Sequence, residues 1–579
     1  MLGHSRHRHS AHRSFLQPAR RRPERRAQSE AEEIMNAAPV LEIKNLQIAL
    51  PKGADRPYAL QDLTLTINPG EIVCLVGESG SGKSLSAGAI MRLLPEPHVH
   101  VTHGTIKLEG TDLYSLSEAD MKKLRGDRIG MIFQEPMTAL NPQKTVGWQI
   151  DEVLRLHTKL GRKERRAAVL DMLAEVKIPD PESAYNAYPH QISGGQRQRV
   201  MIAMALILKP RLIIADEPTT ALDVTTQAQI LKLIRDLQRE HNTGILFITH
   251  DFGVVAEIAD RVAVLRLGEL VEEGPASEVL NHPQHPYTKA LIASVPALTP
   301  PEPKPSVDAQ PVILKASALR KTFKARGGLL IGKRSAVPAV KDLSFELRQG
   351  ETLGVVGESG SGKTTVSRIV TRLLEADSGK VDVNGRDFLS ASPREVRAMR
   401  KDIQMVFQDP MASLNPRRRV VDLIAQGPIV HGVSKEQAHA KARELLELVE
   451  LSPAAADRFP HEFSGGQRQR IGIARALALE PRIVVADEPV SALDVSVQAQ
   501  VLRLLADLRE RLNLSLLFVT HDLRVAAQLC DRIIVMSKGE IAETGPTAEV
   551  FANPQHEYTQ RLLASIPGKG WTPPRLENA

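Results

Sequence analysis

The sequence predicts an α/β protein made of two tandem copies of one domain, each a mainly parallel sheet with helices, an antiparallel β layer and a helical subdomain. Three observations support this. GESGSGKS at 77–84 returns as GESGSGKT at 357–364, and ADEP at 215–218 returns at 486–489. Short apolar runs at 212–215 and 483–486 each precede a helical stretch, as in βα units on a parallel sheet. Residues 63–67 and 343–347 alternate between apolar and polar, which indicates half-buried strands.

The repeat also predicts where the domains lie. FQEPMTALNP at 133–142 returns at 407–416 as FQDPMASLNP, and SGGQRQR at 193–199 returns at 464–470. The offset is 271 for Ser193/Ser464 and for His250/His521, so the second half of each copy has no net insertion. Segments 143–190 and 417–461 are expected to form the helical subdomains, and proline-rich 296–311 a linker. We expect a disordered basic tail at 1–37, the first domain at 38–280, a C-terminal motif with the linker at 281–311, the second domain at 312–552, and a second C-terminal motif and tail at 553–579.

Composition limits the function classes. A chain of 579 residues is too long for one hydrophobic core. No apolar stretch approaches the roughly 18 residues of a membrane span, so we expect none. The net charge is +7, but residues 1–34 hold eight Arg and four Glu, so the rest carries only +3 and no nucleic-acid partner is expected. Translation is hypothesised to start at Met35.

The glycine-rich segments predict phosphate binding. The pattern G-x-x-x-x-G-K-[ST] lets successive backbone N–H groups approach phosphate at a helix N-terminus, where partial positive charge favours anions. Apolar strands are expected just before both segments, at 72–76 and 352–356. Lys83 and Lys363 are expected to reach the β- and γ-phosphates of a nucleotide, and Ser84 and Thr364 to place a hydroxyl on Mg²⁺.

The Asp-Glu pairs that follow apolar strands predict hydrolysis. A carboxylate at the carboxyl end of a parallel strand points into the ligand crevice. Asp216 and Asp487 are therefore expected to hold Mg²⁺. The adjacent Glu217 and Glu488 are the candidates to polarise the attacking water, because water is a poor nucleophile unless it is positioned and relieved of its proton.

Further features recur in both copies: the SGGQ segments, the Ala-Leu-Asp triplets at 221–223 and 492–494, the glutamines at 134 and 408, and the histidines at 250 and 521. Together with the loops, they make the chain from about residue 38 resemble the ATP-binding-cassette superfamily. The resemblance implies that Ser193, Gly194 and Gly195 cap the phosphate held by Lys363, and that their counterparts in the second copy cap the one held by Lys83. It also implies that Gln134 and Gln408 sense Mg²⁺ and the nucleophilic water. His250 and His521, each 34 residues after its Asp, are then implied to contact the γ-phosphate.

The complete set of expected site residues is as follows. Catalytic roles are expected for Glu217, Glu488, His250, His521, Gln134 and Gln408. The expected ATP-binding residues are Gly77, Glu78, Ser79, Gly80, Ser81, Gly82, Lys83, Ser84, Gly357, Glu358, Ser359, Gly360, Ser361, Gly362, Lys363, Thr364, Ser193, Gly194, Gly195, Gln196, Ser464, Gly465, Gly466, Gln467 and Phe323. The expected Mg²⁺ ligands are Ser84, Gln134, Asp216, Thr364, Gln408 and Asp487.

The two copies depart from the family pattern at a few positions. Ile192 and Phe463 precede SGGQ where leucine is usual. The adenine-stacking aromatic of the family matches Phe323 in the second copy, whereas the first copy offers only Tyr58 as a weaker match. Since the residues for hydrolysis are present in both copies, two active sites are expected.

A further repeat indicates the branch of the family. NHPQHPYTKALIASVP at 281–296 returns as NPQHEYTQRLLASIP at 553–567, which resembles the C-terminal motif of the ATPases that serve oligopeptide, dipeptide and glutathione importers. The resemblance implies ATP and Mg²⁺ as cofactors, two separate transmembrane permease subunits as partners, and an indirect link to a periplasmic or extracellular peptide-binding protein. It also implies a peripheral location on the cytoplasmic face of the bacterial inner membrane.

Soluble cassettes also occur in two other classes of protein. Tandem cassettes also occur in translation factors that act on ribosomes, but those usually have a long charged helical linker in place of a short proline-rich one. A DNA-repair or chromosome-type ATPase is disfavoured because the sequence has no zinc-finger cysteine set and no coiled coil.

Overall fold

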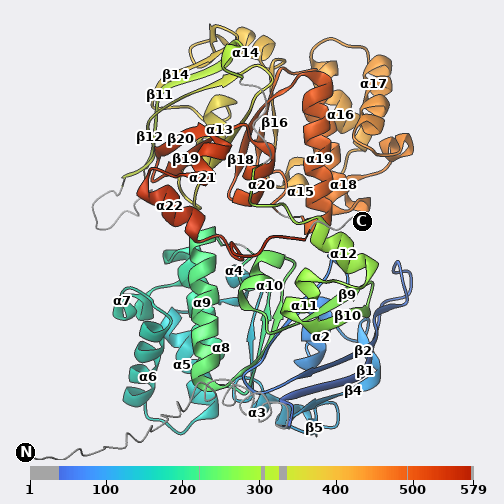
Figure 1. The fold of residues 1–579 in the computed structure, drawn as a ribbon, viewed down its shortest axis with the longest axis vertical. Coiled ribbons are helices and arrows are strands. Elements are labelled where there is room, and N and C mark those ends of the chain that lie inside the picture. The colour runs from blue at the N-terminus through green and yellow to red at the C-terminus, as the bar shows by residue number, and fades with distance from the viewer. Residues whose placement is uncertain (1–37, 221, 301–306, 325–335, 492, 575–579) are drawn as a thin grey trace, which may run out of the picture.

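The computed structural model describes residues 38–220, 222–300, 307–324, 336–491 and 493–574. The two copies fold as separate domains stacked along the long axis of the molecule (Figure 1). The predicted basic tail and the hypothesised start at Met35 lie outside the described residues, as does part of the predicted linker.

Each domain contains two sheets, as predicted. In the first domain, a four-stranded antiparallel sheet has the order β2-β1-β4-β5, and a six-stranded sheet has the order β10-β9-β3-β8-β7-β6, in which only β10 is antiparallel. The strands are β1 (Leu41–Ala49), β2 (Tyr58–Ile67), β3 (Ile72–Val76), β4 (His100–Leu108), β5 (Thr111–Asp112), β6 (Ile129–Ile132), β7 (Leu212–Asp216), β8 (Gly244–Ile248), β9 (Arg261–Arg266) and β10 (Glu269–Pro275).

The helices of the first domain fall into three groups. The helical subdomain comprises α5 (Val146–His157), α6 (Arg162–Glu175) and α7 (Pro181–Asn186). The parallel sheet carries α2 (Lys83–Ile90), α3 (Glu118–Leu124), α4 (Pro136–Ala139), the 3₁₀ turn at Pro189–Gln191, α8 (Gly194–Leu206), α9 (Val224–His241) and α10 (Phe252–Ile258). The C-terminal motif forms α11 (Ala276–Asn281) and α12 (Pro286–Ala293).

The second domain repeats this plan, with the sheet orders β12-β11-β14-β15 and β16-β17-β18-β13-β19-β20. Its strands are β11 (Val312–Lys324), β12 (Ala336–Arg348), β13 (Thr352–Val356), β14 (Ser378–Val383), β15 (Arg386–Asp387), β16 (Ile403–Val406), β17 (Ile483–Asp487), β18 (Ser515–Thr520), β19 (Arg532–Ser537) and β20 (Glu540–Pro546). Its helices are α13 (Lys363–Val370), α14 (Pro393–Met399), α15 (Pro410–Ser413), α16 (Val420–Val430), α17 (Lys435–Leu448), α18 (Gly465–Leu477), α19 (Val495–Leu512), α20 (Leu523–Leu529), α21 (Thr547–Ala552) and α22 (Glu557–Ala564); 3₁₀ turns lie at Val307–Ala309, Pro453–Asp457 and Pro460–Glu462.

Each parallel sheet separates two hydrophobic cores because successive side chains of a strand point to opposite faces. In β3, Ile72, Cys74 and Val76 pack toward the helical side, while Val73 and Leu75 pack toward the antiparallel sheet. Both faces are therefore covered, which is why the strand reads as a continuous apolar run. Burial raises the pKa of the Cys74 thiol, so this cysteine is an inert core residue.

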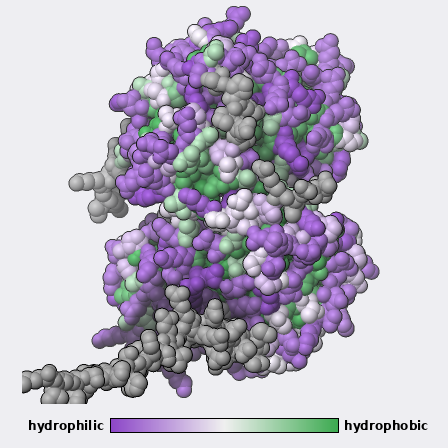
Figure 2. Space-filling model, viewed as in Figure 1, coloured by the Kyte–Doolittle hydropathy of each residue, from purple (hydrophilic) through white to green (hydrophobic). Residues whose placement is uncertain are grey.

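The chain segments after the two C-terminal motifs cross to the opposite domain. Gln528 of α20 donates to the carbonyl oxygens of Ala297 and Thr299, both at 2.8 Å. In return, Gly568 N donates to Glu257 Oε2 of α10 at 3.3 Å, and Trp571 packs against the core of the first domain. Apolar side chains gather on the second domain next to this boundary, on an otherwise largely hydrophilic face (Figure 2). The predicted linker thus begins as part of the interface between the domains.

Candidate nucleotide-binding sites

The phosphate-binding loops have a backbone that only glycine tolerates at their last turn. Gly82 and Gly362 cap α2 and α13, each with φ of 106°. A Cβ at Gly82 would lie 2.6 Å from the carbonyl oxygen of Ala59, and one at Gly362 would lie 2.3 Å from that of Ala339. The loop therefore presents backbone N–H groups at a helix N-terminus, the arrangement that binds phosphate.

The lysine of each loop is buried and bonded to the loop itself. Lys83 Nζ donates to the carbonyl oxygens of Gly77 at 2.7 Å and Glu78 at 2.9 Å, and Lys363 makes the same two contacts in the second loop at 2.8 and 2.9 Å. Burial lowers the pKa of Lys83, although the nearby Glu217 and Asp216 oppose the shift. The ammonium group is thus held inside the loop, where an anionic ligand would be bound.

The predicted metal ligands lie side by side at both sites. Ser84 Oγ donates to Asp216 Oδ1 at 3.1 Å, and Thr364 Oγ1 to Asp487 Oδ1 at 3.4 Å. Burial raises the pKa of both aspartates, so each carboxylate favours a cation beside it. Hydroxyl and carboxylate oxygens are ligands that fit Mg²⁺. The second site differs in one contact, because Ser367 Oγ also donates to Asp487 Oδ2, at 2.9 Å.

The glutamate next to each aspartate is held in a strained backbone conformation. Glu217 and Glu488 have φ of 46° and 45°, in the left-handed region that glutamate rarely adopts. Their N–H groups donate to the carbonyl oxygens of Ile248 and Val519, at 3.0 and 2.9 Å, which ties each glutamate to the neighbouring strand. The strain directs both carboxylates into the sites from the ends of β7 and β17.

Three side chains hold the Glu217 carboxylate. Gln134 Nε2 and Thr220 Oγ1 each donate to Oε2 at 3.0 Å, and His250 Nδ1 lies 3.2 Å from Oε1. Burial favours the neutral form of Glu217, but the hydrogen bond and charge of His250 outweigh it, so the pKa of Glu217 is lowered. For the same reason the pKa of His250 is raised despite its burial.

The second site repeats this geometry, which brings the predicted glutamine, glutamate and histidine together twice. Gln408 Nε2 donates to Glu488 Oε2 at 2.8 Å, and His521 Nδ1 lies 3.2 Å from Oε1. The pKa shifts have the same directions and causes as in the first site. An ionised carboxylate beside a phosphate-binding loop can orient a water molecule and accept its proton.

Each cavity at a phosphate-binding loop is lined by both domains. Ser491, Leu493 and Asp494 of the second domain line the cavity at Lys83. In return, Thr220, Leu222 and Asp223 of the first domain line the cavity at Lys363. Asp494 and Asp223 each oppose the lowering of the pKa of the lysine across the interface. The segment that follows each Asp-Glu pair therefore lines the cavity at the phosphate-binding loop of the opposite domain.

The predicted signature residues stand apart from these cavities in the structure. Ser193 and Ser464 are exposed N-caps of α8 and α18, and each accepts a hydrogen bond from the N–H of the glutamine three residues later. Neither serine is among the residues that line the cavities at the two lysines. Their role opposite the phosphates therefore stays a prediction.

The predicted adenine contact differs between the copies. Phe323 at the end of β11 is 45% exposed, so its ring is available to a ligand. The two copies can be aligned by a residue with left-handed backbone, which is Asn45 in β1 and Ala318 in β11. Phe323 lies five residues after Ala318, and Leu50 lies five residues after Asn45. Tyr58 instead lies opposite Ala49 on the neighbouring strand. By strand position, the first copy has a leucine where the second has the aromatic ring.

Two sets of contacts at these sites are not predictable from the neighbouring residues alone. The charges of Asp494 and Asp223 act on Lys83 and Lys363 of the opposite domain. The repeated Ala-Leu-Asp triplets were the signal in the sequence that these segments matter. Tyr287 and Tyr558 of the C-terminal motifs hydrogen bond to the phosphate-binding loops. The exact repetition of tyrosine in both motifs was the available signal.

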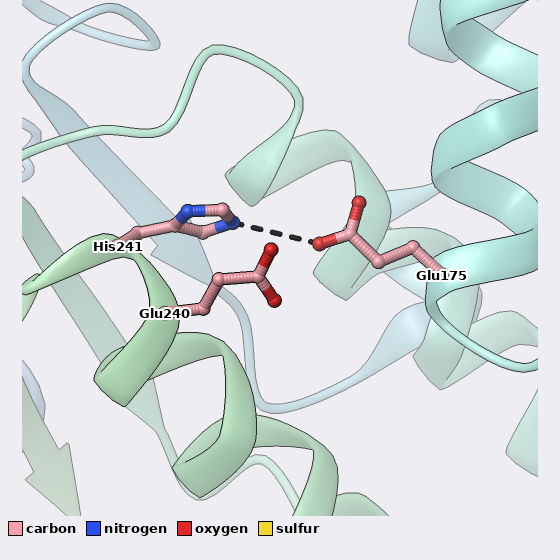
Figure 3. A group of neighbouring side chains, drawn as sticks. All are labelled: Glu175, Glu240 and His241. Carbon is pink, nitrogen blue, oxygen red and sulfur yellow. Dashed lines mark ion pairs between the residues drawn. The ribbon is translucent and has the colours of Figure 1, made fainter.

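Among the described residues, one further group of potential metal ligands is Glu175, Glu240 and His241, at the ends of α6 and α9 (Figure 3). His241 Nε2 faces Glu175 Oε1 at 3.5 Å, a contact that joins the two helices. The corresponding helices α17 and α19 of the second domain end at Leu448 and Leu512. The group is a structural contact of one copy and lies apart from the nucleotide sites.

Two phosphate-binding loops, each with a buried lysine, a paired aspartate and glutamate, and residues from the opposite domain, define an ATPase of the ATP-binding-cassette class. The family model described as ABC transporter matches residues 60–220 and 340–491. The model described as oligopeptide/dipeptide transporter, C-terminal region, matches 271–326 and 542–575. The chain belongs to the ABC transporter family.

The curated relatives agree over nearly the whole chain. It is 48% identical over 532 residues to the peptidoglycan transport ATP-binding protein YejF of Agrobacterium fabrum, covering 92% of this chain and 97% of the relative. It is 48% identical over 563 residues to the glutathione import ATP-binding protein GsiA of Escherichia coli O157:H7, covering 92% and 90%. A cassette of MJ0796, solved as a dimer with ADP and phosphate, is 31% identical over 40% of this chain and 98% of its own, with a TM-score of 0.37.

Proposed function

We propose that this protein is the ATP-hydrolysing subunit of an importer for peptides, with dipeptides, oligopeptides and glutathione as candidate cargoes. The observation that carries the proposal is the C-terminal region of peptide transporters, which follows each of the two cassettes. The named relatives support the same branch, since one is a glutathione importer subunit and another a peptidoglycan transport subunit. Importer subunits of this kind act on membrane permeases, and no helix of the described residues is long and apolar enough to cross a membrane.

Within each site we assign the residues distinct roles. Lys83 binds the β- and γ-phosphates, while Ser84, Asp216 and Gln134 would hold Mg²⁺, which neutralises phosphate charge when bound. Glu217, held by Gln134 and His250, orients the water and accepts its proton. Lys363, Thr364, Asp487, Gln408, Glu488 and His521 act in the same way at the second site.

The signature segments would complete the sites when the domains close. The N–H groups at the start of α8 point out from a helix N-terminus, and Ser193 is exposed there. We infer that Ser193, Gly194 and Gly195 bind the γ-phosphate held by Lys363, and that Ser464, Gly465 and Gly466 bind the one held by Lys83. ATP would then favour the closed state through contacts that only this state makes.

An apolar groove in the first domain, and an exposed methionine at the matching position of each domain, support docking on two permease subunits. Phe133, Leu140, Val153 and Met201 line a groove between β6, α5 and α8, directly beside Gln134. Met137 on α4 is 57% exposed next to it, and its counterpart Met411 on α15 is 47% exposed. Exposed large apolar side chains repeated at matching positions are typical of an interaction surface. With permeases docked there, the protein would sit on the cytoplasmic face of the inner membrane, and a peptide-binding protein outside would deliver the cargo.

Transport by a reconstituted system tests the proposal. The protein and its two permeases are placed in proteoliposomes together with the cognate binding protein, and uptake of a labelled dipeptide, oligopeptide or glutathione is measured with and without ATP. We expect ATP-dependent uptake of at least one of these. Sedimentation of the native protein with ribosomes, together with no uptake, would instead support the translation-factor class.

Charge at these two methionines should uncouple the ATPase from the permeases. Met137→Glu with Met411→Glu should abolish binding to the permeases, because a buried carboxylate in an apolar interface lacks a partner. The basal ATPase of the isolated protein should be unchanged. Leu267→Glu is the matched control, since Leu267 is 61% exposed but lies in the β9–β10 turn. Normal permease binding by the double variant would contradict the docking proposal.

A further inference from the structure

In both domains, a tyrosine of the C-terminal motif contacts the phosphate-binding loop. Tyr287 Oη accepts a hydrogen bond from Glu78 N at 3.3 Å and donates to Glu78 Oε2 at 3.2 Å. Tyr558 Oη accepts from Glu358 N at 3.1 Å. Two independent copies of one sequence motif thus place the same hydroxyl on the same main-chain N–H group.

The tyrosine is itself fixed by a repeated set of contacts. His285 caps α12 by accepting from Tyr287 N at 3.2 Å, and Glu272 of β10 accepts from the N–H groups of Gln284 and His285 at 2.7 and 3.1 Å. The second domain repeats all three contacts with His556 and Glu543. Burial raises the pKa of Tyr558 to about 12, so its hydroxyl keeps its proton at neutral pH.

Glu78 is also the point where three parts of the molecule meet. Its carbonyl oxygen accepts from Lys83 Nζ at 2.9 Å, within the loop. Its main-chain N–H is held by Tyr287. Its carboxylate accepts a hydrogen bond from Ser496, in the first turn of α19 in the second domain. A residue of the phosphate-binding loop therefore links its own C-terminal motif to the opposite domain.

We propose that Tyr287 and Tyr558 are positioning residues for ATP binding: each hydroxyl fixes the backbone of its phosphate-binding loop through the N–H of Glu78 or Glu358. A loop already held in its binding conformation loses less conformational entropy when ATP binds. The C-terminal motif thereby acts on the nucleotide site of its own domain. Each tyrosine acts through the main chain of the loop and not on the nucleotide, so each is a positioning residue and not a catalytic one.

Removal of the two hydroxyls tests the proposal in the full-length protein. In Tyr287→Phe with Tyr558→Phe, the rings remain and only the hydrogen bonds are lost. We expect the KM for ATP to rise by about three- to ten-fold, the effect of losing one modest hydrogen bond per site, while kcat changes less than about two-fold. Hydrogen exchange read by mass spectrometry should be faster in peptides that contain Glu78 and Glu358.

Tyr185→Phe is the matched control, because Tyr185 lies on α7 in the helical subdomain, and it should leave both readouts unchanged. The melting temperature separates positioning from folding. A higher KM with faster exchange at Glu78 and Glu358, at an unchanged melting temperature, supports the proposal. An unchanged KM and unchanged exchange would overturn it, as would a rise in KM that appears only with a lower melting temperature.

Discussion

At the scale of single residues, the two strained glutamates carry the first prediction. Glu217→Gln with Glu488→Gln keeps the size of the side chains but removes the group that accepts the proton of water. ATP hydrolysis should fall by at least about 100-fold, whereas ATP should still bind. Phosphate release and nucleotide titration measure the two effects. Each single variant should retain activity at its intact site, and hydrolysis at the wild-type rate in the double variant would refute the assignment of both carboxylates.

The glutamate–histidine pairs predict a pH dependence of stability. The folded-state pKa of His250 is raised above 6.5, so its contribution to stability is fully present below about 6.5 and is lost as the pH rises through the folded value. That of Glu217 is lowered below 4.5, so its contribution is present above about 4.5 and is lost as the pH falls through the folded value. The pairs therefore stabilise the nucleotide-free protein most between these limits.

Calorimetry checks this dependence. From pH 6 to pH 8.5, the melting temperature of the wild type should fall relative to that of His250→Gln with His521→Gln, because only the wild type loses the imidazolium. Parallel curves for the two proteins would show that the histidines are not charged in the folded state.

At the scale of elements, Gly466 and Gly472 of α18 should respond oppositely to the same substitution. A Cβ at Gly466 would lie 2.2 Å from Val497 Cγ1 at the start of α19, whereas a Cβ at Gly472 meets nothing within 4 Å. Gly466→Ala should therefore lower the denaturation midpoint of the second domain. Gly472→Ala should raise stability by about 0.5–1 kcal/mol, because alanine favours a helix interior over glycine.

A second substitution tests whether this contact is the cause. Val497→Ala removes the atom that the new methyl group would meet, so Gly466→Ala should cost less stability in the Val497→Ala background than in the wild type. Equal losses in both backgrounds would show that the effect comes from the helix itself.

The elements also show what sequence can predict. The phosphate-binding loops, the strands that end in Asp216 and Asp487, and the helices after them were predicted because each depends on a few neighbouring residues. The contacts of Glu78 with Tyr287 and Ser496 span 209 and 418 residues, and no periodicity or spacing encodes such pairs. Leu50 is identified as the counterpart of Phe323 only by the matching left-handed residues Asn45 and Ala318, which are a feature of the backbone and not of the sequence.

At the scale of the whole molecule, the two domains hold each other by reciprocal contacts that involve no nucleotide. The helices that follow His250 and His521, α10 and α20, each bind the main chain of the segment that crosses from the other domain. Each domain also places one valine against the core of the other. Val224 packs in the core of the second domain, and Val495 packs against the core of the first. These contacts would keep each phosphate-binding loop close to the opposite domain between rounds of ATP binding.

Cleavage of the linker tests whether the crossed segments are sufficient to hold the domains together. With a protease site placed within residues 301–306, the halves of the wild type should stay together on size-exclusion chromatography in the absence of ATP. Gln528→Ala with Trp571→Ala removes two hydrogen bonds and a partly buried ring, so its cleaved halves should separate. Trp148→Ala controls for the loss of an indole from α5 in the helical subdomain. Separation of the wild-type halves, or continued association of the halves of the double variant, would show that the crossed segments are not what holds the domains together.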